Sequence, residues 1–166
     1  MKVTIDARFY GLENAGLGRY TIGLLDELQK IDSKNSYSIL LRKKYFDQLK
    51  LPKNFTKVLA EIPHYSAREQ LGMPKIVAST SPDITHFLHF NIPLSFRGSF
   101  IVTIHDLLMH KSTGRDATTL PMFLYHFKRF GYKAVFRYAV SASKQIIVPS
   151  NFVKKELVDF YKIAGS

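Results

Sequence analysis

Short apolar runs alternate along the chain with longer segments in which apolar residues recur every three or four positions. Apolar runs of strand length are typical of strands buried on both faces of a parallel sheet. Segments of helical period, such as the one carrying Tyr20, Leu24 and Leu28, predict amphipathic helices. The predicted strands are 2–6, 36–41, 56–62, 82–90, 99–108 and 145–150, and the predicted helices are about 17–31, 45–49, 67–80, 119–142 and 151–161.

This alternation predicts an α/β fold with a doubly wound, mainly parallel sheet and helices on both faces. The 166 residues suit one Rossmann-like domain. Ligands of such sheets bind beyond the carboxyl ends of the strands. Loop 7–16, the segment after Thr85 and residues 105–110 all follow predicted strand ends, so we expect them to line one crevice.

Two residues bear on where helices begin. Ser150 precedes the last predicted helix, and its hydroxyl can accept a hydrogen bond from the backbone there as an N-cap. Pro74 lies inside the predicted helix 67–80, where its ring and missing N–H group predict a kink or a later start.

The stretch AGLGRYTIGLLDEL places Gly16, Gly18 and Arg19 at the start of the first predicted helix. Backbone N–H groups at a helix N-terminus attract anions, and glycine lets an anion approach the backbone closely. These three residues are therefore candidates for binding a phosphate group. The alternative is a turn whose glycines only let the chain enter the helix.

Two common nucleotide-binding motifs do not fit this turn. The dinucleotide fingerprint needs a third glycine where Thr21 stands, and it directly follows the strand, whereas Gly16 lies ten residues beyond Asp6. The sequence contains no Gly-Lys-Ser/Thr, so it has no P-loop. NAD and P-loop chemistry are both disfavoured.

Four of the six histidines fall in the expected crevice, namely His86, His89, His105 and His110. His105 and Asp106 directly follow the apolar run, and a histidine beside an acid can act as a general base or orient a hydroxyl group. A metal ion held by His86, His89, His105 and Asp106 is an alternative. Polar lining without a metal is the favoured interpretation.

Charge adds one constraint on partners. The chain has 24 Lys and Arg against 13 Asp and Glu, and its net charge of +11 points to an anionic partner. Nucleic acid, anionic lipid head groups and phosphorylated small molecules all qualify, and a solvated basic surface is the alternative.

The chain has no cysteine, which fits a reducing compartment. It has no apolar stretch long enough for a signal peptide or a membrane span.

The predicted helix 119–142 mixes basic and aromatic residues. Helical spacing predicts one inward face with Phe123, Phe127, Phe130, Ala134 and Tyr138, and an outward face with Tyr125, Lys128, Arg129, Tyr132, Lys133, Phe136 and Arg137. An outward face of this composition suits an anionic membrane surface or single-stranded nucleic acid. Cover by another layer or a partner domain is the alternative, and it is the favoured one.

Taken together, these stretches resemble the N-terminal domain of the family 4 retaining glycosyltransferases, which have the two-domain GT-B fold. The resemblance covers nearly the whole chain. Its anchors are IDAR (5–8), GLGRYTIGLLDEL (16–28), PDITHFLHFNIPL (82–94), TIHDL (103–107) and IIVPSNFVKKEL (146–157). Pro149 departs from many relatives, and no functional consequence follows from it.

The resemblance implies a role for each matched position. Gly16 and Gly18 would lie near the diphosphate or sugar of the donor, with Arg19 adding charge. His105 would line the active centre with Asp106 supporting it. His86, His89 and Asn91 would belong to the acceptor side.

The same resemblance implies a reaction and a setting. A sugar would move from a nucleotide diphospho-sugar co-substrate to a glycan or lipid-linked acceptor, without a cofactor or metal. The protein would be cytoplasmic, at the inner face of the cell membrane, where Lys128, Arg129, Lys133 and Arg137 would meet anionic lipid. The C-terminal domain, which carries most of the nucleotide site, is absent from this chain, so we expect the chain alone to be inactive. The alternative is a non-enzymatic basic module that docks on an anionic membrane or nucleic acid, with nucleic acid less favoured.

Overall fold

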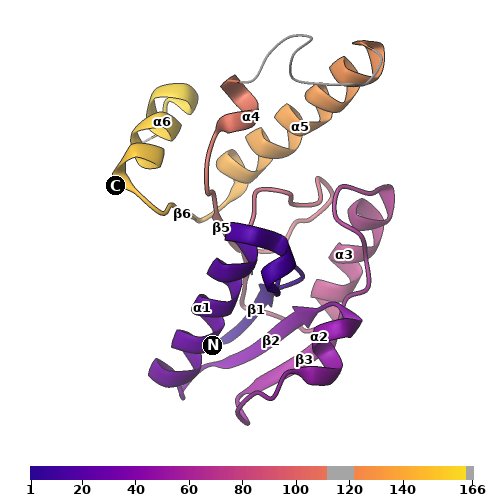
Figure 1. Ribbon diagram of the computed structural model, residues 1–166, viewed down its shortest axis with the longest axis vertical. Helices are drawn as coiled ribbons and strands as arrows, with labels where there is room; N and C mark the ends of the chain where they lie inside the picture. The colour runs from indigo at the N-terminus through magenta and orange to yellow at the C-terminus, as the bar shows by residue number, and fades with distance from the viewer. Residues whose placement is uncertain (112–121, 164–166) are drawn as a thin grey trace.

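A computed structural model of the chain describes residues 1–111 and 122–163 (Figure 1). The strands are β1 (Lys2–Asp6), β2 (Ser36–Leu41), β3 (Phe55–Leu59), β4 (Ile84–Phe87), β5 (Phe100–Thr103) and β6 (Gln145–Ile147). They form one sheet in the order β3-β2-β1-β4-β5-β6, and all of its neighbouring strands run parallel. The chain builds outward from β1 to β3, then returns to β4 on the other side of β1. The predicted doubly wound parallel fold is confirmed, and its order reverses between β1 and β4.

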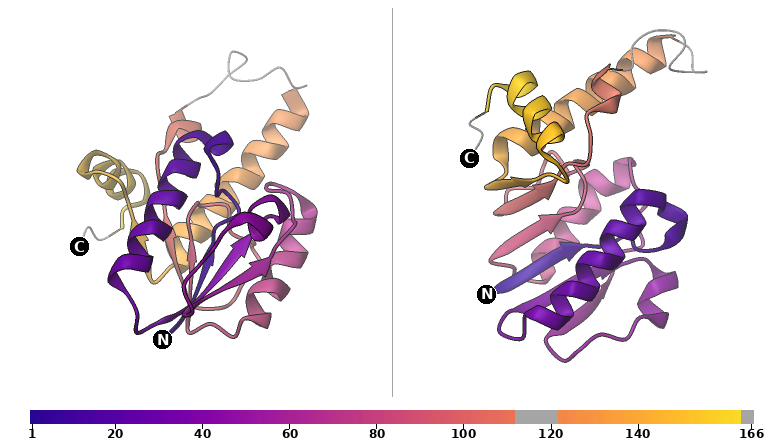
Figure 2. Two further views of the ribbon diagram at one scale, coloured as in Figure 1. Left: turned by 60° about the horizontal axis from the view of Figure 1, so that its bottom comes forward. Right: turned by 60° about the vertical axis from the view of Figure 1, so that its left-hand side comes forward.

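Helices connect the strands and cover both faces of the sheet. They are the short 3-10 helix η1 (Leu12–Asn14), followed by α1 (Ala15–Ile31), α2 (Lys43–Gln48), α3 (Ala67–Ser79), α4 (Leu108–Lys111), α5 (Met122–Ala142) and α6 (Asn151–Tyr161). α1 lies on one face, whereas α3 and α5 lie on the other (Figure 2). None of the helices within the described ranges is both long and apolar enough to cross a membrane.

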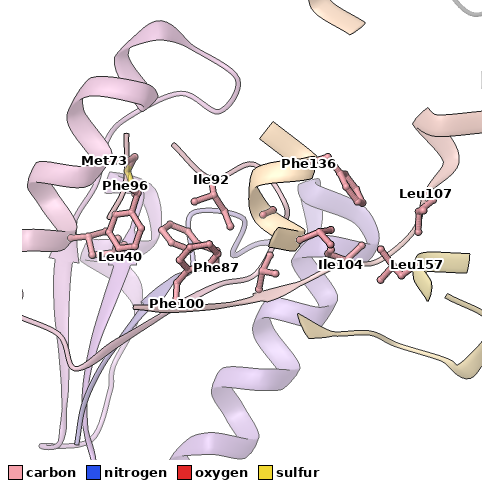
Figure 3. Close-up of a cluster of buried hydrophobic side chains, with 14 of the residues drawn as sticks. Leu40, Met73, Phe87, Ile92, Phe96, Phe100, Ile104, Leu107, Phe136 and Leu157 are labelled. Carbon is pink, nitrogen blue, oxygen red and sulfur yellow. The ribbon is translucent and has the colours of Figure 1, made fainter. Parts of the chain in front are cut away.

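Alternation along β2 sends its side chains into two separate hydrophobic clusters. Tyr37, Ile39 and Leu41 pack in one cluster with Leu25 of α1, whereas Leu40 belongs to the other. The second cluster joins the sheet to α3, α5 and α6, and its fully buried members include Met73, Phe87, Phe100, Ile104 and Phe136 (Figure 3). Burial of β2 on both faces explains why its sequence reads as an almost continuous apolar run.

The two helix-boundary predictions have different outcomes. Ser150 is the N-cap of α6, and its hydroxyl accepts a hydrogen bond from the Val153 N–H group, as predicted. Pro74 does not delay α3, which begins at Ala67 and continues through the proline, so the predicted later start is wrong. A proline cannot donate to the carbonyl four residues earlier, at Gln70. The Ser95 hydroxyl donates to that carbonyl instead, at 2.8 Å, so the lost helical bond is replaced by a tertiary one.

The predicted facing of helix 119–142 is wrong for three aromatic residues, whereas Lys128, Lys133 and Arg137 are exposed as predicted and Tyr138 packs against the core. Phe136, expected outside, is fully buried, and Tyr132 is half-buried against the core. Phe130, expected inside, is 74% exposed. Aromatic residues occupy both sides of this helix, so periodicity alone could not choose between them. Residues 119–121 and the side chains of Phe123, Tyr125 and Phe127 lie outside the described part of the chain.

Candidate functional site

The carboxyl ends of β1, β4 and β5 lie side by side in the sheet, and the residues that follow them form what we call the rim (residues 6–9, 86–91 and 103–106). Tyr20 of α1 reaches this rim, where its hydroxyl lies 3.2 Å from the Thr103 hydroxyl. The same Thr103 oxygen is hydrogen-bonded to His86 Nε2 at 2.9 Å. One threonine at the end of β5 therefore links α1, β4 and β5.

His105 stands directly beyond β5, where it was predicted. Its Nε2 lies 3.0 Å from the carbonyl oxygen of Leu88, and its ring meets the Tyr20 ring edge-on at 4.9 Å. Because a carbonyl oxygen only accepts, Nε2 must carry the proton in this bond. Nδ1 of a neutral His105 is then the acceptor nitrogen, available to a hydroxyl group or a developing positive charge.

Asp106 is exposed, and its Oδ1 accepts a hydrogen bond from the Leu108 N–H group at 2.9 Å. This bond satisfies a backbone donor at the start of the short helix α4. The group that orients His105 is thus the Leu88 carbonyl. Support of His105 by Asp106 stays a prediction.

The two glycines of the predicted phosphate turn are in different environments. Gly16, in the first turn of α1, is exposed, and a Cβ there would meet no heavy atom within 4 Å. Gly18 is buried, and a Cβ would overlap the carbonyl oxygen of Gly11. Packing alone therefore requires glycine at position 18, whereas nothing in the fold requires it at position 16.

Gly16 lies one helical turn before Tyr20, the residue of α1 that contacts the rim. It precedes Tyr20 by four residues on α1, and residues at this spacing share one side of a helix. Because the Tyr20 ring contacts His105, the open first turn of α1 and His105 lie on the same side of the molecule. Arg19 is exposed at the same helix end. The donor-binding role of Gly16, Gly18 and Arg19 stays a prediction.

A buried ionic centre joins Asp6 and Arg8 of the rim to Glu69 of α3, and it was not predicted from the sequence. Arg8 donates two hydrogen bonds to the Asp6 carboxylate, at 2.8 and 2.7 Å, and one to Glu69 Oε1 at 2.7 Å. Its remaining guanidinium nitrogen donates to the Ile62 carbonyl at 3.1 Å. All three charged side chains are less than a tenth exposed.

Arg8 partly compensates the two buried carboxylates of this centre. Burial alone would raise the pKa of Asp6, but the charge and hydrogen bonds of Arg8 outweigh it and hold that pKa below its usual value. Burial likewise opposes ionisation of Glu69, whose pKa is lowered by His64 and Arg8. Both carboxyl groups are therefore ionised at neutral pH. An acid and an arginine two residues apart at the end of a buried strand were the available sequence signal.

Glu69 also joins three segments of the chain. Its Oε2 accepts hydrogen bonds from the Tyr65 N–H group at 2.7 Å and from the side-chain amide of Asn91 at 2.5 Å. His64 lies beside Oε1, with its Nδ1 at 3.5 Å, and its ring stacks on Phe9 at 3.7 Å. Asn91, a predicted acceptor-side residue, is thus held by α3 rather than pointing freely outward.

Burial is the main cause that lowers the pKa of both His86 and His89. Burial lowers the pKa of His86 to about 4. Burial together with the nearby His105 and His64 lowers that of His89 to about 3. His89 Nδ1 accepts from the Asn91 N–H group at 3.3 Å. Among the described residues, no three His, Cys, Asp or Glu side chains converge to form a metal site.

His110, grouped with the other three by sequence, belongs to a different centre. Its Nε2 lies 2.5 Å from the Tyr161 hydroxyl, and its Nδ1 lies 2.8 Å from the Tyr132 hydroxyl. We call these three residues the histidine centre, and it joins α4, α5 and α6. Burial and the charges of Lys133 and Arg129 lower the pKa of His110. The expectation that all four histidines line one crevice is wrong for His110, because α5 and α6 fold over it.

The predicted basic surface is only partly as expected. Lys128, Lys133 and Arg137 are exposed on α5. Arg129 is half-buried, and it donates to the His110 carbonyl at 3.5 Å. It therefore contributes to packing at the end of α4 as well as to the surface charge.

Two hollows appear away from the rim. One of about 380 Å³ lies between α5, β6 and α6, with Val140, Lys144 and Leu157 among its lining residues. The other, of about 260 Å³, is lined by Leu107, His110, Glu156, Asp159 and Phe160. Neither includes Gly16 or His105, so the rim is not part of either hollow.

Comparison of the sequence with models of protein families gave no match, and comparison with curated proteins also gave none. The functional assignment therefore depends on the fold and on the residues of the rim.

Proposed function

We propose that this chain is the N-terminal, acceptor-side domain of a retaining glycosyltransferase that uses a nucleotide diphospho-sugar. The observation that carries the proposal is the position of the first turn of α1. It opens at Gly16, on the side of the helix where Tyr20 contacts His105, beyond the carboxyl ends of a parallel sheet. Sheets of this topology bind their ligands at that edge.

The start of α1 and the rim residue His105 have separate roles in the proposed transfer reaction. The N–H groups at the start of α1, aided by the helix dipole, stabilise the negative charge that develops on the leaving diphosphate. The bond from the anomeric carbon to the diphosphate breaks as the bond to the acceptor oxygen forms. The acceptor proton passes to the departing phosphate. His105, held in one tautomer by Leu88, presents Nδ1 to a hydroxyl group near the reacting carbon.

A binding experiment on the 166-residue chain tests the donor side. We expect UDP or GDP at millimolar concentration to shift the backbone amide NMR signals of residues 15–19. Gly16→Val should abolish that shift, because a branched side chain would cover the amides. Gly23→Val is the matched control, since Gly23 is also on α1 with open space around its Cα and should leave the shift unchanged. An unaltered nucleotide response in the Gly16 variant would contradict the proposal.

A transfer experiment tests the chemistry. It uses an enzyme that unites this chain with the nucleotide-binding domain that the proposal requires. His105→Ala should reduce transfer of radiolabelled sugar at least a hundredfold, while the melting temperature stays nearly the same. The chain alone should transfer no sugar. Full activity of the His105 variant would contradict the proposed role of His105. Robust turnover by the 166-residue chain would contradict the requirement for a second domain.

A second candidate function is docking on an anionic membrane. Phe130 is 74% exposed on α5, and Lys133 and Arg137 follow it at helical spacing. An aromatic ring beside cations suits the head-group region of a bilayer. Co-sedimentation with phosphatidylserine vesicles tests it.

The vesicle experiment needs a variant matched in charge. Lys133→Glu/Arg137→Glu should abolish binding, whereas Lys50→Glu/Lys53→Glu, with the same change in net charge, should not. Equal loss of vesicle binding in both variants would show that the total charge of the protein, and not this surface of α5, accounts for binding. Tighter binding to a single-stranded oligonucleotide than to vesicles would favour nucleic acid instead.

A further inference from the structure

Tyr65 has an unusual backbone conformation beside the rim. Its φ angle is +58°, in the left-handed region that bulky residues seldom occupy, and its side chain is 65% exposed. This conformation is unfavourable for residues that carry a Cβ. A buried carboxylate holds it in place, because Glu69 Oε2 accepts from the Tyr65 N–H group at 2.7 Å. Because the residue is 65% exposed, core packing does not explain an aromatic side chain here.

The Tyr65 ring lies beside the rim residue His89. It meets the His89 ring edge-on, with centroids 6.0 Å apart, and the His64 ring lies 6.4 Å away. Partial burial and the negative charges of Glu69 and Asp106 raise the pKa of the Tyr65 phenol to about 12. Asp106 therefore lies within electrostatic reach of this ring.

This set of groups matches the surface of a sugar. One face of a pyranose ring is apolar C–H, which packs on an aromatic ring whose face is negative. Its hydroxyl groups donate to carboxylates and imidazole nitrogens. An exposed aromatic ring in a fixed position, with a carboxylate and a histidine beside it, offers both kinds of contact.

We propose that Tyr65 is the stacking surface for a sugar ring of the acceptor, with Asp106 accepting hydrogen bonds from its hydroxyl groups. The inference rests on the proposed function and names the acceptor as a carbohydrate at this position. The buried bond to Glu69 fixes the loop before the sugar arrives, so less conformational entropy is lost on binding.

The sequence contains no tryptophan, which makes a direct test possible. Tyr65→Trp introduces a single indole that keeps an aromatic surface at the site. We expect its fluorescence to change saturably with at least one of methyl glucoside, methyl mannoside, methyl galactoside, N-acetylglucosamine and maltose. Phe152→Trp is the control, because Phe152 is 66% exposed on α6, away from the rim. It should show no response.

A second measurement does not depend on the new indole. Saturation-transfer NMR with the same sugars should give signals for the wild-type chain and for Tyr65→Phe. It should give at least tenfold weaker signals for Tyr65→Ala and Asp106→Ala. Equal signals in wild type and Tyr65→Ala, or no response to any sugar in either method, would overturn the proposal.

The nucleotide titration separates this inference from the proposed function. If sugars change the indole signal at position 65 but UDP and GDP leave the amides of residues 15–19 unmoved, the sugar site stands and the transferase assignment fails. If nucleotides move those amides and no sugar responds at Tyr65, only the sugar site is overturned.

Discussion

The molecule contains two buried polar centres of opposite character. The ionic centre joins the end of β1 to α3, and its one cation, Arg8, is paired with two carboxylates, those of Asp6 and Glu69. The histidine centre joins α4, α5 and α6 through one imidazole and two tyrosine hydroxyls. Each holds together segments far apart in the sequence. The comparison shows that a charged centre and a neutral centre can both hold distant segments together, but with different sensitivity to pH.

The difference follows from the direction of the pKa shifts. In the ionic centre, the pKa values of Asp6 and Glu69 are lowered, so both stay ionised well into the acid range. In the histidine centre the pKa of His110 is lowered, so the folded protein resists protonation that the unfolded chain accepts. Mild acid should therefore affect His110 before it affects the carboxyl groups of the ionic centre.

The largest expected effect is at Glu69. Glu69→Ala leaves the Tyr65 N–H group and the Asn91 amide without their partner and removes one counter-charge of Arg8. Breaking a buried ion pair in this way costs about 3–5 kcal/mol. Urea denaturation measures it.

Glu61→Ala is the matched control for that change. Its ion pair with Arg42 is substantially exposed, and its loss should cost less than about 1 kcal/mol. Similar losses in the two variants would remove the distinction between a buried ionic centre and an ordinary surface pair.

Acid provides the next largest effect. The unfolded chain binds protons on His86 and His89 near pH 6.5, whereas the folded protein does so only near pH 4 and 3. Stability should therefore be fully present above pH 6.5 and fall as the pH drops below it. His86 alone accounts for roughly 3 kcal/mol over the whole interval, at about 1.4 kcal/mol per pKa unit. Urea denaturation at pH 7.5, 6.5 and 5.5 measures the slope.

Between pH 6.5 and 5, the change in the free energy of unfolding reports on the histidines, because the carboxyl groups of the ionic centre are still ionised there. His86→Gln should give a flatter profile than wild type in this window. A wild-type stability that does not change between pH 7.5 and 5.5 would show that the buried histidines are not coupled to folding.

A smaller effect is expected in the histidine centre. Tyr161→Phe removes one hydroxyl from His110 and should cost about 1 kcal/mol. Since Tyr161 ends α6, we expect faster amide hydrogen exchange there, with little change in α3 near Glu69. Equal acceleration in both helices would mean that the two centres do not stabilise separate parts of the molecule.

The smallest effect concerns the rim rather than its support. Gly16→Ala and Gly23→Ala should each raise stability by roughly 0.5–1 kcal/mol, because alanine favours helices and both positions have room for a Cβ. Only Gly16→Ala should weaken nucleotide binding. Thermal unfolding with and without UDP or GDP measures both quantities. Weaker binding in both variants would argue against a specific role for Gly16.

Much of the fold could be predicted because its signals are local. The strand at 36–41 was predicted with the bounds of β2, from an apolar segment of strand length. Ser150 was predicted as an N-cap from its position alone. His105 was placed correctly because the parallel arrangement fixes where the residue after a strand goes. The orienting role of the Leu88 carbonyl could not be predicted, because it depends on the path of a neighbouring loop.

The sequence by itself determined the type and order of the elements, the parallel sheet and the edge of the sheet where ligands are expected. It did so because helical and strand periods, caps and breakers act over a few residues. Only the tertiary structure decided which side of α5 is buried, that Gly18 rather than Gly16 is required by packing, and that Arg8 lies between two carboxylates. These facts depend on contacts between segments distant in sequence. Burial and charge compensation exist only once those segments have packed together.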